Sequence, residues 1–230
     1  MRRVGRILGL LLIVAGGLVL GWVIVVWQWQ DPFTAIYTHI EQSHLSHKYE
    51  KRLASYPQQV PHGDTGAIER QIAVEAAAYR RSLHTGDPVG RLTIGRIGLH
   101  MIVVQGTDDE TLKKGPGHYQ PSYLPGQGQL IYVAGHRTTY LAPFADINDI
   151  RVGDYVTLSV PYGTFTYRAF RHYVVPASQL SVLQSHGREI LRLQACHPRF
   201  FATHRYIVDA RLVSVTPTGG RTFVPTTAAS

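Results

Sequence analysis

The chain places three residue types that can cooperate in acyl transfer next to the ends of expected strands. Cys196, the only cysteine, ends an alternating apolar segment, and Pro198 two residues later prevents regular continuation of a strand. We therefore expect the thiol at a strand edge that a substrate can reach. Since a thiolate is a strong nucleophile, this cysteine is a candidate for covalent catalysis, whereas most single cysteines are small, inert hydrophobic residues.

Arg205 begins the next expected strand, after a loop at 197–204. If the two strands pair as a hairpin, Cys196 and Arg205 lie nearly opposite one another. A guanidinium beside the sulfur would favour the thiolate and hold an oxyanion in the transition state. The alternative is that Arg205 is an ordinary charge at the rim of the domain.

His136 follows the expected strand 129–134 after Gly135, a residue that lets the backbone turn or approach another segment closely. A histidine at a strand exit can donate a proton to a leaving amine and remove one from an incoming amine. His197 is the alternative partner because it adjoins Cys196. Side chains alternate across a strand, however, so His197 is expected to point away from the thiol.

Composition and charge narrow the function classes. The 230 residues carry a formal charge of +8, but Arg2, Arg3 and Arg6 precede a hydrophobic run, and without them 20 basic residues face 15 acidic ones. The remaining chain has neither a basic block nor a glycine-rich phosphate loop, so we expect no nucleic-acid partner and no cofactor. A single cysteine rules out an internal disulfide and a cysteine-based zinc site.

The first hydrophobic run, residues 7–27, has 21 positions without a charge. At the helical rise it spans about 32 Å, against a hydrocarbon core of about 30 Å. A cleaved signal peptide is the alternative, but the run is too long for one and is followed by the aromatic segment 27–30 instead of a small-residue cleavage site. The arginines before the run place residues 1–6 in the cytoplasm and the chain after it outside.

Residues 28–90 are expected to form an extracellular stem with helical segments. A first helix, ending before Pro57, carries apolar residues at loosely helical spacing: Ile36, Ile40, Tyr49 and Leu53. A second, amphipathic helix, capped by Asp64 or Thr65, is expected to pack on the catalytic domain through Ile68, Ile72, Ala76, Tyr79 and Leu83; a purely spacer role is the alternative. The first helix also contains His39, His44 and His47, but no carboxylate-rich setting surrounds them, so no metal site is expected.

From residue 91 the chain alternates apolar and polar residues, as strands do. Glycines and prolines separate the expected strands, which are 91–97, 101–104, 130–134, 155–160, 165–175, 190–196 and 206–215. Seven or eight strands with little helix indicate a closed or nearly closed barrel. The tail at 217–230 is rich in Thr, Gly, Pro and Ala and is predicted to be disordered.

Three groups of motifs resemble the sortase family, most closely the class E sortases of actinobacteria. They are Gly115-Pro-Gly-His-Tyr119, then Ala134-Gly-His-Arg-Thr-Thr-Tyr140 with Ala142-Pro-Phe144, and Leu193-Gln-Ala-Cys-His-Pro198 followed by Arg205-Tyr-Ile-Val208. The resemblance covers about residues 90–215. It implies a mainly β fold, an eight-stranded sortase-type barrel at 91–216, in which His136, Cys196 and Arg205 are the catalytic residues.

The resemblance also implies a function: that of a cysteine transpeptidase of Gram-positive bacteria. Such enzymes cut an LPxTG-like or LAxTG-like sorting signal between Thr and Gly through a thioacyl intermediate. The expected partners are secreted proteins with a C-terminal sorting signal and an amine of a peptidoglycan precursor (lipid II). The expected location is the plasma membrane, crossed once, with the catalytic domain outside.

Three further positions are predicted to bind substrate. In class E relatives an aromatic residue at the position of Tyr119 contacts the second residue of the signal and favours Ala over Pro; a packed loop tyrosine is the alternative. Where the family has Thr-Leu-x-Thr-Cys, this chain has Arg192-Leu-Gln-Ala-Cys196, so Ala195 lacks a hydroxyl beside the acyl site. By alternation, Arg192 shares a face with Cys196 and is expected to line the groove.

Two other functions compete with this interpretation. An L,D-transpeptidase is disfavoured because Ser185-His-Gly187 resembles its motif while Arg188 stands where the nucleophilic cysteine belongs. A catalytically weak sortase-like barrel, acting as a peptide- or wall-binding module, is the second alternative and is motivated by Arg192 and Ala195.

Overall fold

A computed structural model describes residues 2–28, 32–57 and 60–226, except for the side chains of residues 2, 24–28, 32 and 33. Its α-helices are α1 (Arg2–Gln28), α2 (Pro32–Ser55), α3 (Thr65–Ser82) and α4 (Asp109–Leu112), and its 3-10 turns are η1 (Gly95–Ile97), η2 (Ile147–Asp149) and η3 (Leu180–Leu183). The strands are β1 (Pro88–Ile94), β2 (Leu99–Gln105), β3 (Gly117–His118), β4 (Leu130–Gly135), β5 (Tyr155–Val160), β6 (Gly163–Pro176), β7 (Ile190–His197) and β8 (His204–Pro217).

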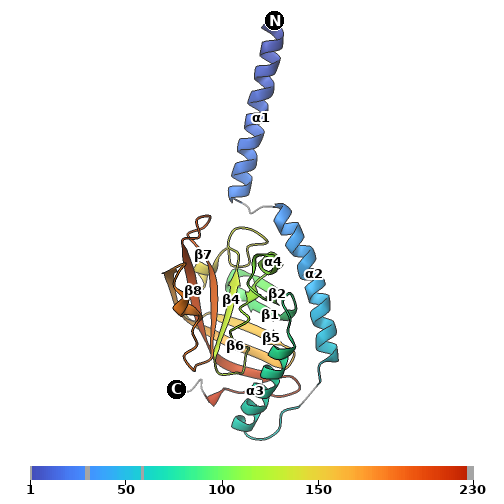
Figure 1. Ribbon diagram of the computed structural model, residues 1–230, viewed down its shortest axis with the longest axis vertical. Helices are drawn as coiled ribbons and strands as arrows, with labels where there is room; N and C mark the ends of the chain where they lie inside the picture. The colour runs from blue at the N-terminus through green and yellow to red at the C-terminus, as the bar shows by residue number, and fades with distance from the viewer. Residues whose placement is uncertain (1, 29–31, 58–59, 227–230) are drawn as a thin grey trace.

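The eight strands close into a barrel in the order β1-β2-β3-β4-β7-β8-β6-β5 (Figure 1). β4 runs parallel to β7 and β2 parallel to β3, while the other neighbours are antiparallel. The predicted eight-stranded barrel is therefore confirmed. The sequence did not reveal β3, because its two residues are too few to show any alternation.

The two faces of the central strands carry different side chains, as strand alternation requires. On β7, the inward positions Leu191, Leu193 and Ala195 are fully buried in the main hydrophobic core. On β4, the outward positions Leu130, Tyr132 and Ala134 form a second, smaller apolar cluster with Val182 from η3. The connection from β6 to β7 therefore crosses the outside of the barrel over these two strands.

Helix α1 contains a candidate membrane span at Arg3–Val23, 21 residues with a mean hydropathy of 2.2 and exposed along its length. By length and composition this helix can cross a membrane, and an N-terminal signal sequence passes the same test. The aromatic segment 27–30 that the sequence interpretation relied on lies outside the residues whose side chains are described.

Helix α3 packs on the barrel as predicted. Asp64 is its N-cap, and its carboxylate accepts a hydrogen bond from the backbone N–H of Ala67 at 2.8 Å. The predicted apolar stripe enters the main core through Ile72, Ala76, Tyr79 and Leu83, with Ile68 packed beside them.

Helix α2 also packs on the barrel, but of the expected apolar residues only Tyr49 belongs to the stripe that docks. Ile36 and Ile40 are 61% and 50% exposed, whereas Leu45 and Tyr49 are buried against Ile102 and Val104 of β2. The docked stripe is spaced by four, three and four residues and consists of Thr38, Gln42, Leu45 and Tyr49. Because half of it is polar, a search for apolar residues could not find it.

The two polar residues of that stripe bond to the backbone of the barrel. The Thr38 hydroxyl donates to the carbonyl of Lys113 at 2.7 Å. The Gln42 amide donates to the carbonyls of Ile102 and Lys114 and accepts from the N–H of Ile102, at 2.7–3.0 Å. These contacts hold α2 in one register along the barrel wall.

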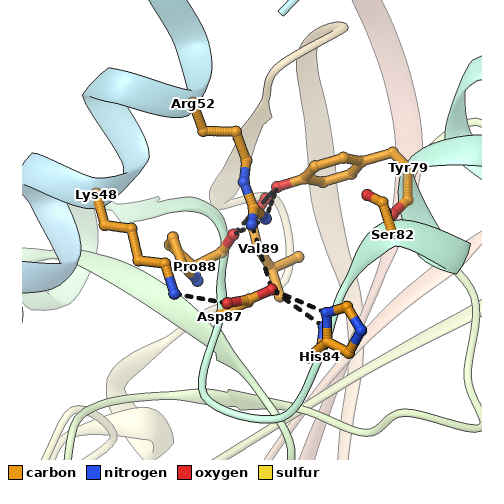
Figure 2. Close-up of polar contacts among 8 residues, drawn as sticks. All are labelled: Lys48, Arg52, Tyr79, Ser82, His84, Asp87, Pro88 and Val89. Atoms are coloured by element: carbon orange, nitrogen blue, oxygen red, sulfur yellow. Dashed lines mark hydrogen bonds and ion pairs between the residues drawn. The ribbon is translucent and has the colours of Figure 1, made fainter. Parts of the chain in front are cut away.

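A cluster around Asp87 joins α2 and α3 to the start of β1 (Figure 2). The Asp87 carboxylate pairs with Lys48 at 2.7 Å and with Arg52 at 3.2 Å, both from α2, and accepts from the N–H of His84. Burial raises the pKa of Asp87, but these donors outweigh it and hold that pKa at about 2. The Tyr79 hydroxyl lies beside Arg52 and within 3.1 Å of the Pro88 and Val89 carbonyls. The stem helices are thus part of the folded domain.

The tail predicted to be disordered, 217–230, follows β8. Phe223 forms an isolated β-bridge with Val215, and Thr226 donates hydrogen bonds to the carboxylate of Glu69 on α3. Residues 227–230 lie outside the described part of the chain.

Candidate active site

The three residues proposed for catalysis lie at one end of the barrel. Cys196 on β7 pairs directly with Arg205 on β8 in the antiparallel register. Gly135, the last residue of β4, pairs with Ala195 on the parallel neighbour β7, so His136 leaves its strand at the same edge. All three residues line one cavity of about 360 Å³ on the outer face of the sheet.

Besides His136, Cys196 and Arg205, the walls of this cavity come from two strands and three connecting segments. The outer faces of β4 and β7 supply Tyr132, Ala134, Gly135 and Gln194, and α4 with the residues before it supplies Thr107, Asp109 and Leu112. The β6–β7 connection contributes Ala177, Gln179, Leu180, Val182 and Leu183, and the loop after β3 contributes Tyr119. The cavity is thus an open groove between the strand pair β4–β7 and three connecting segments.

The backbone around His136 requires glycine at position 135. A Cβ there would meet the ring of Phe144 at 2.7 Å, closer than Cβ contacts in proteins allow. The N–H of Phe144 then donates to the carbonyl of His136 at 3.0 Å, which closes the loop against the strand end. This close approach explains the glycine that precedes the histidine.

Burial lowers the pKa of His136, and the nearby Lys113 lowers it further, while the carboxylate of Asp109 acts in the opposite direction. The Tyr140 ring lies 5.3 Å from the imidazole, centre to centre. At neutral pH the neutral form of His136 is therefore favoured, and this form can accept a proton.

The loop that carries Tyr140 also contacts the stem. The N–H of Tyr140 donates to the hydroxyl of Thr34 on α2 at 3.1 Å, and the ring of Tyr37 packs edge-on against the Tyr140 ring at 6.4 Å. Tyr140, Leu141 and Ala142 have positive φ angles, which these residue types rarely adopt. The first turns of α2 therefore support the loop that holds His136.

The Arg205 side chain is fixed from the β7–β8 loop. Its Nη1 donates to the carbonyl of Ala202 at 2.7 Å and to that of His204 at 3.0 Å. A guanidinium has five N–H donors, so these two bonds leave donors that can serve a substrate oxygen in the cavity. The Cys196 thiol is partly exposed beside it.

His197 has different neighbours from Cys196. Its Nδ1 lies 3.0 Å from Nη1 of Arg137, and its ring lies 6.0 Å from that of Tyr206. It is not among the described residues that line the cavity. This agrees with the expectation that His197 points away from the thiol, on the opposite side of the strand.

The structure separates the three predicted substrate-binding residues. Tyr119 lies in the cavity wall, where its ring packs edge-on against Tyr132 at 5.9 Å. Ala195 and Arg192 do not appear among the described lining residues. Ala195 is fully buried in the main core, because it occupies an inward position of β7.

Arg192 shares the outer face with Cys196, as predicted, but it is covered. Its Nε and Nη2 pair with the two carboxylate oxygens of Asp209 at 2.6 and 2.9 Å, and its Nη1 donates to the carbonyl of Val182 at 2.5 Å. Asp209 is completely buried and also accepts from Arg171. The Arg192 side chain therefore lies beneath the β6–β7 connection and holds one residue of the cavity wall.

Sequence reasoning missed several residues of the site. Gln194 lines the cavity and accepts a hydrogen bond from the Tyr132 hydroxyl. Asp209 was also missed, although a single carboxylate inside the apolar segment Tyr206–Ala210 is an available signal for a buried ion pair. The part of the chain that the structure describes contains no group of three or more His, Cys, Asp or Glu arranged to hold a metal ion.

A thiol, an imidazole and a guanidinium around one groove can perform acyl transfer through a thioester. The profile of the protein family described as "Sortase domain" matches residues 92–213. The chain is 31% identical over 169 residues to Sortase D of Bacillus subtilis (strain 168), covering 72% of this chain and 82% of that relative. It is 24% identical over 215 residues to Sortase A of Bacillus anthracis, covering 92% and 96%.

Solved structures give the same result. Sortase E from Streptomyces avermitilis is 34% identical with a TM-score of 0.53, over 59% of this chain and 94% of that one. The Sortase D5 transpeptidase of Clostridium perfringens has the same fold, with 20% identity and a TM-score of 0.61 over 75% and 98% of the two chains. With its barrel, its family match and these relatives, the chain belongs to the sortase family of cysteine transpeptidases.

Proposed function

We propose that the protein is a membrane-anchored transpeptidase that cleaves an LPxTG-like or LAxTG-like sorting signal between Thr and Gly. It then transfers the secreted protein to an amine of the cell wall precursor lipid II. The observation that carries the proposal is the direct pairing of Cys196 with Arg205 in a groove that His136 also lines.

In the first step the Cys196 thiol passes its proton to His136, and the sulfur attacks the Thr carbonyl of the signal. Arg205 donates hydrogen bonds to the oxyanion of the tetrahedral intermediate. The C–N bond to Gly then breaks, His136 returns the proton to the departing amine, and a thioester remains on Cys196.

In the second step the amine of the acceptor attacks the thioester carbonyl, and His136 removes a proton from this amine. The C–S bond breaks, the sulfur leaves as thiolate, and a new amide joins the protein to the acceptor. Burial lowers the pKa of His136, so the neutral base that this step needs is the favoured form at neutral pH.

We assign the protein to the class E group on the motif around Tyr119. Its position in the cavity wall supports a contact with the second residue of the signal and a preference for Ala over Pro there. A peptide library that varies this residue tests the assignment. Tyr119→Ala should reduce the Ala-over-Pro preference, and an unchanged ratio would remove Tyr119 from substrate recognition.

For location, we propose that residues 7–27 cross the plasma membrane once. Arg2, Arg3 and Arg6 support a cytoplasmic N-terminus, followed by the stem at 28–90, the catalytic domain at 91–216 and the tail at 217–230 outside. Protease added to intact cells should digest the catalytic domain. Protection of this domain until the cells are lysed would contradict the orientation.

Cleavage of a fluorogenic sorting peptide by the full-length chain tests the catalytic assignment. Cys196→Ala and His136→Ala should abolish turnover, whereas His197→Ala, a change of the neighbouring residue outside the cavity, should retain most of it. Persistent turnover by Cys196→Ala would refute the role of the thiol.

A further inference from the structure

The catalytic end of the barrel is tied closely to the end of α1. Only residues 29–31 separate Gln28, the last residue of α1, from Pro32, the first of α2. Even fully extended, this connection spans at most about 14 Å. The first turns of α2 contact the loop after His136 through Thr34 and Tyr37. If α1 crosses the membrane, as the proposed function requires, the catalytic end must lie near the bilayer surface.

The β7–β8 loop lies at this same end (Figure 1). Because β4 and β7 are parallel, the loop after His136 and the loop after His197 leave the same edge of the barrel. The two loops also touch, since Arg199 donates to the carbonyl of Ala145 at 2.6 Å and pairs with Asp146 at 2.8 Å. If the loop after His136 lies near the bilayer surface, the β7–β8 loop therefore lies near it as well.

The β7–β8 loop exposes two large aromatic side chains. Phe200 is 59% exposed and Phe201 is 77% exposed. Leu180, on the neighbouring β6–β7 connection, is 69% exposed. Phe200 and Ala202 have φ angles of 73° and 52°, a conformation that residues with a side chain rarely adopt. Phe200 and Phe201 therefore form an apolar tip of the loop that is exposed and not buried.

We infer that this tip rests in the headgroup region of the same bilayer that α1 crosses, so that the catalytic groove opens at the membrane surface. The inference rests on the anchoring role of α1 in the proposed function. Segments that lie on a membrane bury Phe and Leu side chains at the boundary between headgroups and acyl chains, because this removes apolar surface from water. Paired exposed aromatics at the membrane-proximal end match this environment.

The bilayer is a better occupant for the tip than a passing peptide. The groove already offers a sorting peptide the apolar outer face of β4 and the β6–β7 connection. Phe200 and Phe201 are not among the described residues of that lining. A tip outside the groove lining, at the end tethered by a short connection, meets the membrane before it meets a soluble partner.

Site-directed spin labelling of the full-length chain tests this inference. Cys196→Ala removes the only native thiol, so Phe201→Cys in that background gives one labelling site. The chain is reconstituted into vesicles of phosphatidylcholine with phosphatidylglycerol, and collision of the label with oxygen and with a water-soluble nickel complex is measured. His186→Cys in the same background is the matched control, because this exposed position precedes β7 at the opposite end of the barrel.

The label at position 201 should collide several-fold more with oxygen relative to nickel than the label at 186, which should report water. Equal, aqueous values at both positions in vesicle-bound protein would overturn the inference. Vesicle flotation separates this from failure of the anchor, because a chain without a membrane anchor would stay at the bottom of the gradient in both variants. Circular dichroism of the labelled chains, matched to the unmodified protein, confirms that both variants fold.

Discussion

The inner and outer faces of β7 carry out different tasks with residues that alternate along one strand. Leu191, Leu193 and Ala195 point inward and are fully buried in the core. Gln194 and Cys196 point outward and line the groove. Arg205, the register partner of Cys196, lines it as well. Along eight residues, the inner face stabilises the barrel and the outer face supplies reactive groups.

The division between the two faces of β7 explains why the barrel suits the chemistry. The reactive side chains are fixed at a strand edge by a core on the other side of the same backbone, so they need little reorganisation when substrate binds. Changes on the outer face should therefore reduce activity without unfolding the protein. Changes on the inner face should destabilise the protein without reducing its activity.

Among variants that keep Cys196 and His136, the largest effect on activity is expected at Arg205. Arg205→Ala removes the proposed oxyanion donor and should lower kcat/KM by about 10²–10³-fold, while the free energy of unfolding changes little. Arg211→Ala, an exposed arginine farther along β8, is the matched control and should keep full activity. If both variants lost kcat/KM equally, the loss would come from removing a positive charge and not from removing an oxyanion donor.

An inner-face substitution should give the opposite result. Leu193→Ala removes a fully buried side chain and should lower the free energy of unfolding by about 3 kcal/mol, measured by urea denaturation. Gln194→Ala, one residue along on the outer face, should cost much less stability and more activity. If Leu193→Ala impaired catalysis at full stability, the division between the faces would fail.

Arg192 lies on the outer face yet is buried, so it should affect both properties. Arg192→Ala leaves the Asp209 carboxylate with Arg171 as its remaining guanidinium partner and should cost about 3 kcal/mol of stability. It also frees the Val182 carbonyl in the cavity wall, so KM for the sorting peptide should rise more than kcat falls. An unchanged KM would show that this ion pair does not position the cavity wall for substrate binding.

The smallest effect is expected at Tyr140, which covers the imidazole of His136. Tyr140→Ala admits water, and since burial lowers the pKa of His136, that pKa should rise toward its usual value. The limb of the pH–kcat/KM profile that reports His136 should move to higher pH, with about a threefold to tenfold loss of rate from the lost ring contact. Tyr155→Ala, an exposed tyrosine on β5, should leave the profile in place.

Much of this arrangement could be predicted because strand alternation is a local property. The expected hairpin placed Cys196 opposite Arg205, and the apolar stripe and cap of α3 were read from spacing alone. The same hairpin register also places Arg192 opposite Asp209, four residues back along one strand and four forward along the other. The Arg192–Asp209 ion pair could therefore have been predicted from the sequence.

Other features depend on contacts between distant segments and leave no local pattern. The docked stripe of α2 is half polar, and the barrel carbonyls that bond Thr38 and Gln42 lie 60–75 residues away along the chain. The cover that η3 forms over Arg192 follows from the path of a connection, not from its composition. Predicting such contacts requires the closed barrel to be known first.

The most direct test of the account is to trap the acyl-enzyme. The full-length chain is mixed with a sorting peptide without an amine acceptor, quenched in acid, and digested for mass spectrometry. If Cys196 is the nucleophile, the part of the peptide before Gly will be attached to Cys196, hydroxylamine will release it, and His136→Ala and Arg205→Ala will reduce the amount of adduct. Turnover without an adduct on Cys196, or an adduct on another residue, would contradict the central claim.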